Sequence, residues 1–173
     1  MSDALQALYQ GDEERARQLL PPDDELSVFE AAAFGRDERL AAILRGDPAQ
    51  TKAFSDDGFT ALHLAVFGRQ EQAARVLLEA GADPNVLATS SLAPVPPLGT
   101  AAFVRSVSLA RLLLDHGADP NRPGEGGLTA LHAAAQNGDE QLAQLLLERG
   151  ADRGLAAEDG RRPADFGLAD LLG

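Results

Sequence analysis

Three histidines and two acidic pairs are the side chains of this sequence best suited to chemistry. Imidazole and carboxylate groups act as metal ligands and as general acids or bases, but either use needs several of them at one place. Their spacing matches no recognisable metal motif, and each acidic pair precedes a glycine, as in an exposed turn. We therefore expect no metal site and no acid–base catalysis from them. The residues are His63, His116, His132, Asp56, Asp57, Glu158 and Asp159.

Other catalytic chemistries have no residues to support them. Cysteine is absent, which excludes disulfides, thiolate metal sites and thiol nucleophiles. The serines lie in no nucleophile-elbow context, and the glycines form no loop that would cradle a phosphate. An enzyme would need a cluster of groups with perturbed pKa values. We expect a protein that is not an enzyme and that uses no cofactor.

Two short phrases recur along the chain and predict its architecture. Gly-Ala-Asp follows a leucine-rich run at Gly81, Gly117 and Gly150, with spacings of 36 and 33 residues. Thr-Ala-Leu-His begins at Thr60 and again at Thr129, and a degenerate copy falls between them. The glycines are placed to close helix ends in the left-handed conformation, and the threonines to cap the next helices. Self-similarity near 33 residues is typical of a solenoid.

The two phrases together resemble the ankyrin repeat, in which a turn precedes two short antiparallel helices. The resemblance implies an all-α solenoid of helix-turn-helix units joined by β-hairpin-like fingers, and a surface that binds other proteins. It also implies that His63 and His132 hydrogen-bond the neighbouring turn, with Gly99 and Asp165 as departures from the pattern. Alanine-rich inner helices, as at Ala31-Ala32-Ala33, would let adjacent repeats approach closely.

We expect one domain over residues 1–173. Its predicted parts are an abbreviated N-terminal helical pair (1–24), four repeats (25–56, 57–92, 93–125 and 126–158) and a truncated C-terminal cap (159–173). No run approaches the roughly 20 apolar residues of a membrane span, and the first residues lack the features of a secretory signal. These features favour a cytoplasmic location, and a capped, charged solenoid is expected to be a monomer.

The net charge of −12 bears on the kind of partner. Phosphate backbones and anionic membranes attract basic surfaces, so neither nucleic acid nor membrane is expected. The acidic excess either keeps the protein in solution or attracts a protein with a basic surface. Two functions follow as alternatives: a general module for binding an unknown protein partner, or a dedicated inhibitor or immunity-type protein that covers a basic enzyme surface.

Phenylalanine and arginine recur at the predicted ends of the inner helices. Aromatic and arginine side chains together are favoured anchors at protein interfaces. The repeated residues either contact a partner in the groove that the ankyrin resemblance implies, or the phenylalanines pack between repeats under the arginine stems. The positions are Phe34, Arg36, Phe67, Arg69, Phe103 and Arg105; in the last full repeat Gln136 takes the place of the phenylalanine, and Asn137 beside it is a further candidate.

Two of the predicted fingers are further candidates for partner contacts. One tip contains Asp56, Asp57 and Phe59. The other, residues 86–97, is apolar and uncharged and accounts for three extra residues between successive repeats. Exposed apolar loops mark contacts in many proteins, whereas loops also tolerate insertions that fold against their neighbours. Both interpretations of residues 86–97 remain open at the level of sequence.

Overall fold

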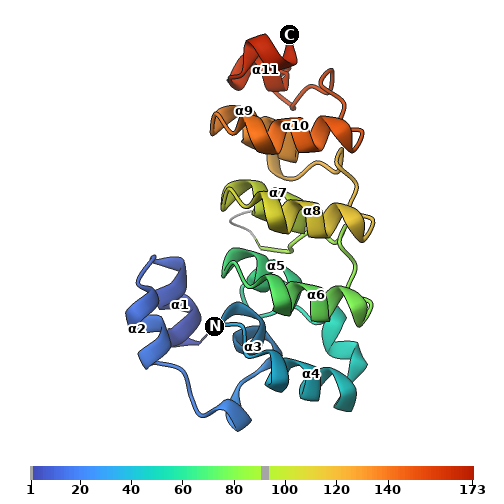
Figure 1. Cartoon of the computed structure of the whole chain (residues 1–173). Helices are drawn as coiled ribbons and strands as arrows, with labels where there is room; N and C mark the ends of the chain where they lie inside the picture. The colour runs from blue at the N-terminus through green and yellow to red at the C-terminus, as the bar shows by residue number, and fades with distance from the viewer. Residues whose placement is uncertain (1, 91–93) are drawn as a thin grey trace. The chain divides into compact units, whose positions relative to one another are not determined.

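A computed structural model of the chain describes residues 2–90 and 94–173 (Figure 1). Its contacts divide the chain into two compact units, unit 1 (Met1–Asp83) and unit 2 (Pro84–Gly173). Unit 1 contains α1 (Asp3–Tyr9), α2 (Glu13–Gln18), η1 (Asp23–Glu25), α3 (Val28–Ala33), α4 (Asp37–Gly46), η2 (Pro48–Lys52), α5 (Ala61–Phe67) and α6 (Glu71–Glu79). Unit 2 contains α7 (Pro97–Phe103), α8 (Val107–Asp115), η3 (Glu125–Gly127), α9 (Ala130–Gln136), α10 (Glu140–Glu148), α11 (Pro163–Phe166) and α12 (Ala169–Leu172).

Each repeat pairs a short inner helix with a longer outer helix. The inner helices are α3 and α5 in unit 1 and α7 and α9 in unit 2, and α4, α6, α8 and α10 are their outer partners. Side chains in the N-cap region fix where the inner helices start: Thr60 and His63 form a capping box at α5, and Ser27 and Glu30 form one at α3. The all-α solenoid class predicted from the sequence is confirmed.

The Gly-Ala-Asp phrase closes the outer helices as the sequence predicts. Gly81, Gly117 and Gly150 have φ values of 89°, 87° and 90°, and a Cβ at these glycines would meet nothing within 4 Å. Glycine is therefore needed for its backbone conformation and not for space. After α6, the amide of Ala82 donates to the carbonyl of Leu77 at 2.9 Å, the long bond of a Schellman motif.

Asparagine joins successive turns within unit 2, a role that the sequence analysis did not predict. The Nδ2 of Asn85 donates to the carbonyl of Gly117 at 2.9 Å, and its Oδ1 accepts from the amide of Asp119 at 2.7 Å. Asn121 repeats both bonds one turn later, to Gly150 at 3.0 Å and Asp152 at 2.7 Å. Each asparagine side chain thus satisfies one donor and one acceptor of the next turn.

Three of the predicted fingers are tight turns, each with a backbone hydrogen bond across its base. The amide of Ser55 donates to Phe59, that of Gly124 to Leu128 and that of Ala157 to Arg161, all at 2.8 Å. In the described part of the chain, β-pairing is seen as an isolated antiparallel bridge between Phe54 and Thr60. The fingers are therefore hairpin-like turns and not paired strands.

Small residues allow the inner helices to lie close together. Ala31, Ala32 and Ala65 in unit 1 have no more than 1% of their surface exposed, as do Ala101 and Ala134 in unit 2. At Gly68, a Cβ would collide with the carbonyl oxygen of Ala33, because α3 and α5 approach at this point. The expected packing role of the alanines agrees with this burial.

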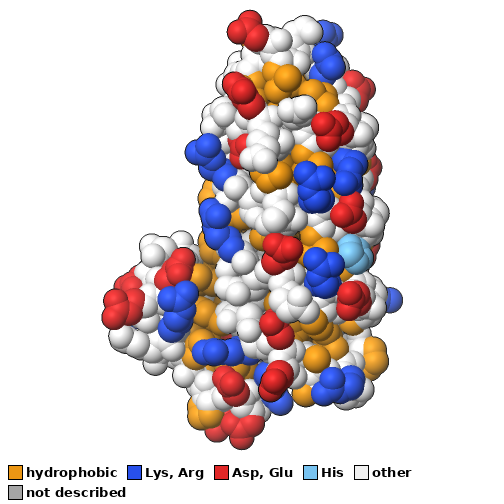
Figure 2. Space-filling model, viewed as in Figure 1, with side chains coloured by type: hydrophobic (Ala, Val, Ile, Leu, Met, Phe, Trp, Pro, Cys, Tyr) orange, Lys and Arg blue, Asp and Glu red, His pale blue; other side chains and the backbone are white. Residues whose placement is uncertain are grey.

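Residues 3–18 form a helical pair, α1 and α2, but this pair does not extend the row of repeats. It lies beside α3 and α5, on the side of unit 1 opposite to α4 and α6 (Figure 1). Leu5 is buried with Ala33 and Leu64, and Leu8 and Tyr9 pack on the same cluster. In the space-filling view, hydrophobic side chains follow the seam between the helical pair and the rest of unit 1 (Figure 2). The pair therefore covers the inner-helix face of unit 1.

Candidate functional site

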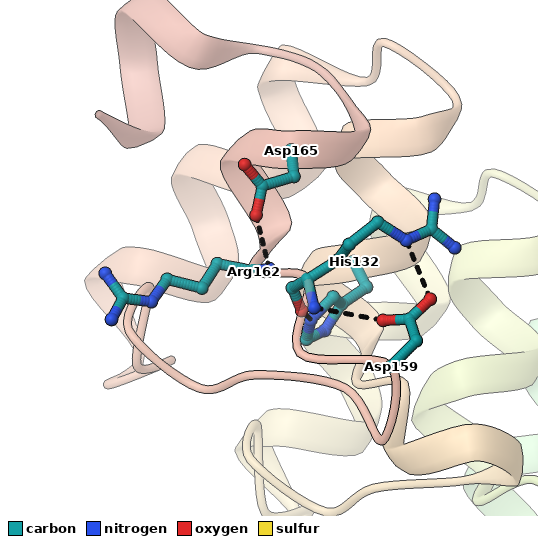
Figure 3. Close-up of polar contacts among 5 residues, drawn as sticks. His132, Asp159, Arg162 and Asp165 are labelled. Atoms are coloured by element: carbon teal, nitrogen blue, oxygen red, sulfur yellow. Dashed lines mark hydrogen bonds and ion pairs between the residues drawn. The ribbon is translucent and has the colours of Figure 1, made fainter.

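The histidines of the repeated phrase have structural roles. The Nδ1 of His132 accepts from the backbone amide of Thr129 at 3.1 Å. This leaves Nε2 to donate to the carbonyl of Arg161 at 3.3 Å (Figure 3). The contact with Arg161 belongs to the neighbouring turn, as the family resemblance implies. Burial lowers the pKa of His132, which favours the neutral form of the imidazole. His63 makes the same capping contact, with Nδ1 3.4 Å from the amide of Thr60.

Of the acidic pair near the C-terminus, Asp159 is engaged in its own turn. The Oδ1 and Oδ2 of Asp159 accept from the backbone and side chain of Arg161 at 3.0 and 2.7 Å (Figure 3). These hydrogen bonds keep the pKa of Asp159 below its ordinary value. Asp165, which departs from the family pattern, takes over the capping role of histidine, because its Oδ2 accepts from the amide of Arg162 at 2.7 Å.

The remaining groups do not assemble a chemical site. The Nδ1 of His116 lies 2.8 Å from the carbonyl of Leu112 in its own helix. Within residues 2–90 and 94–173, no three histidine or carboxylate side chains are arranged to hold a metal ion. No helix in this part of the chain is both long and apolar enough to cross a membrane.

The predicted phenylalanine row differs between the two units. In unit 1, Phe34 and Phe67 are half-buried, because the residues of α1 lie against the same cluster. In unit 2, Phe103 is 70% exposed, and Gln136 is exposed at the same place in the next repeat. Asn137 is half-buried and its Nδ2 donates to the carbonyl of Ala102 at 3.2 Å, which ties α9 to α7.

The predicted arginine row needs one correction of register. Arg69 and Arg105 have φ values of 58° and 54°, and the residues in this left-handed position of the other repeats are Gly35 and Gly138. Arg36 does not share it: Arg36 is the N-cap of α4, because α3 has six residues whereas the other inner helices have seven. Its side chain instead lies 3.6 Å from the carboxylate of Asp23.

Tyr9 contacts the finger tip at Asp57 and Phe59, which the sequence analysis did not predict. Its ring packs edge-on against Phe67 at 5.2 Å and tilted against Phe59 at 6.1 Å. Its hydroxyl donates to the Oδ2 of Asp57 at 2.7 Å. Burial, and then the hydrogen bond and charge of Asp57, raise the pKa of Tyr9 far above its ordinary value. The i, i+3, i+4 spacing of Leu5, Leu8 and Tyr9 was the available signal.

The finger tip with Asp56, Asp57 and Phe59 is therefore partly occupied within unit 1. Asp57 also accepts from the hydroxyl of Ser55 at 2.6 Å, so both of its carboxylate oxygens are engaged. Phe59 is half-buried beneath Tyr9, and Asp56 is exposed. Of the three predicted tip residues, Asp56 is the most exposed, and an interaction with the N-terminus lowers the pKa of its carboxyl.

The apolar finger at residues 86–97 is folded against its surroundings where it is described. Ala88 and Ser90 are buried, and the amide of Ala88 donates to the carbonyl of Val95 at 3.1 Å. Pro96 is the N-cap of α7 in place of threonine. The part of the predicted contact region at residues 91–93 lies outside the described residues.

Comparison with models of known protein families identifies the type of these repeats. The ankyrin repeat model matches residues 57–88, and a model of multiple ankyrin repeats matches residues 100–147. The chain is an ankyrin repeat protein. Ankyrin repeats generally mediate protein–protein interaction. A search of the curated proteins found no significant match.

Proposed function

We propose that this ankyrin repeat protein is a non-enzymatic module that binds a protein partner through the inner-helix ends of unit 2. The observation that carries the proposal is the exposure of Phe103, at 70% the largest among the exposed large hydrophobic side chains of the described residues. A large apolar side chain that is mostly exposed gains free energy when a protein partner buries its surface. Arg105 and Gln136 are exposed at the ends of α7 and α9 and supply polar contacts around it.

Interface energetics support this choice of residues. Buried aromatic and arginine anchors carry most of the binding energy at protein interfaces, and truncation of one such anchor costs about 2 kcal/mol or more. We propose that Phe103 is this anchor and that Arg105 is its charged neighbour. The protein is further proposed to act as a monomer in the cytoplasm, without nucleic acid or membrane as a ligand.

A dedicated inhibitor of a basic enzyme is the second candidate. The net charge of −12 favours it, as do exposed carboxylates at two finger tips, Glu125 and Glu158. A complementary charge pattern of this kind mainly accelerates association, and its effect falls as salt rises. The two candidates therefore differ in which surface dominates and in how strongly salt weakens the complex.

Partner capture with matched variants tests both candidates. The wild-type protein and Phe103→Ala are used to isolate partners from the native organism, and affinities for the recovered protein are then measured. We expect Phe103→Ala to weaken binding by at least thirtyfold, about 2 kcal/mol, and Glu125→Gln to have little effect. If Glu125→Gln weakens binding more than Phe103→Ala, and salt abolishes it, the inhibitor proposal replaces the first.

A further inference from the structure

Unit 1 contains a helix seated on its own inner-helix face. Leu5, Leu8 and Tyr9 form one stripe of α1, because residues three and four apart lie on the same side of a helix. Tyr9 packs on Phe67 at 5.2 Å, and Leu5 is buried with Leu64, which is 1% exposed. The inner-helix face of unit 1 therefore accommodates an amphipathic helix, α1.

Unit 2 carries the same positions on α7 and α9, which pack against each other. Phe103 is the last residue of α7, and Phe34 follows the last residue of α3 as its C-cap. Leu128 precedes the N-cap of α9 as Phe59 precedes that of α5, and Ala133 stands four residues after the N-cap, where α5 has Leu64. In unit 1, Phe34, Phe59 and Leu64 belong to the cluster on which α1 packs, but in unit 2 Phe103 is 70% and Leu128 38% exposed. We call Phe103, Leu128 and Ala133 the unit 2 face.

We propose that the unit 2 face binds an amphipathic helix of the protein partner, in the manner in which α1 covers unit 1. This inference rests on the proposed function, since it names the partner segment for the same surface. The helix presents large apolar residues at i, i+3 and i+4, one of them aromatic, and Ala133 leaves more room for the central side chain than Leu64 does. A carboxylate near the end of the helix pairs with Arg105.

A second copy of this chain is a poorer occupant. Its own α1 is already engaged, with Tyr9 bonded to Asp57 at 2.7 Å and Leu5 buried at 3% exposure. Two chains of net charge −12 also repel each other at the distances of an interface. The occupant is therefore a helix from a different protein.

A display selection with defined variants tests the inference on the full-length protein. Random 16-residue peptides are selected on the wild type, with an excess of soluble Phe103→Asp protein as competitor, and enriched peptides are measured by fluorescence polarisation. Circular dichroism reports their helicity on binding. Leu171→Asp is the matched control, because Leu171 is also an exposed apolar residue of unit 2 and lies on α12.

The expected peptides carry the i, i+3, i+4 pattern and become helical when bound. Their affinity falls at least tenfold in Phe103→Asp and in Leu128→Asp and is unchanged in Leu171→Asp. Enriched peptides that depend on Phe103 but are extended or rich in proline would overturn the helix and leave the proposed function intact. A selection without any Phe103-dependent peptide would overturn both, and a dimer of the wild type that Phe103→Asp dissociates would assign the face to a second copy.

Discussion

Replacing Tyr9 should release the N-terminal helical pair from unit 1 without unfolding the rest of the unit. Tyr9→Phe removes the hydroxyl that donates to Asp57 at 2.7 Å, and Tyr9→Ala removes the ring that packs on Phe67 and Phe59 as well. The control is Gln10→Ala, one residue further along, because Gln10 is exposed. All three variants keep α1 free of glycine and proline, so helix propensity changes little.

The size of the effect follows from these contacts. A hydrogen bond to a charged group contributes about 1.5–3 kcal/mol, and the partial exposure of Tyr9 reduces this to about 1 kcal/mol. Removal of a buried aromatic ring costs about 3–5 kcal/mol, of which we take the lower end at this half-buried position. Opening of the pair should become about fivefold more frequent in Tyr9→Phe and about a hundredfold more frequent in Tyr9→Ala.

Hydrogen exchange of the backbone amides measures this opening directly. In Tyr9→Ala, the amides of α1 and α2 should exchange about a hundredfold faster, whereas those of α9 and α10 should keep wild-type rates. Exchange in α1 that equals the Gln10→Ala control would refute the packing argument. Equal acceleration in unit 2 would show that the pair does not open as a local unit.

Four further results are expected. Arg69→Gly should raise the free energy of unfolding by about 1 kcal/mol, because it relieves a left-handed arginine, and Gly138→Arg should lower it by about as much, both measured by urea denaturation. Ala65→Leu or Ala134→Leu should cost about 1–3 kcal/mol by overpacking fully buried sites, and unchanged midpoints would contradict the tight helix packing. Burial lowers the pKa of His132, so the unfolded chain binds the proton first; stability should therefore fall as pH drops through about 6.5, and His132→Gln should flatten that dependence. Light scattering at micromolar concentration should give the mass of a monomer, and a dimer mass would overturn that proposal.

The sequence predicts the repeats well because their signals are local. A glycine at a helix end and a threonine at a helix start act on the nearest few residues, so Gly81 and Thr60 could be placed without a structure. His132 was placed by the same repeated phrase. The division of the chain into residues 25–56, 57–92, 93–125 and 126–158 stays a prediction.

Tertiary contacts explain what the sequence did not predict. The stripe of Leu5, Leu8 and Tyr9 indicates an amphipathic helix, but its pattern does not say which face of unit 1 it covers. The register of Arg36 depends on the omission of one residue from α3, which spacing alone cannot locate. The exposure of Phe103 likewise depends on whether another part of the chain packs on its side chain, and its position in the repeat does not reveal this.

The asparagine hydrogen bonds of unit 2 hold successive outer-helix turns in a constant arrangement, whereas the loop before the inner helix can vary in length. Asn85 and Asn121 lie 36 residues apart, three more than the usual repeat, yet their bonds to the next turn have nearly the same lengths. The extra length is therefore absorbed between Asn85 and the start of α7, away from the outer-helix turns. Grafted loops or peptide tags should accordingly be tolerated after Asn85, whereas a single deletion between Pro97 and Gly117 would break the register.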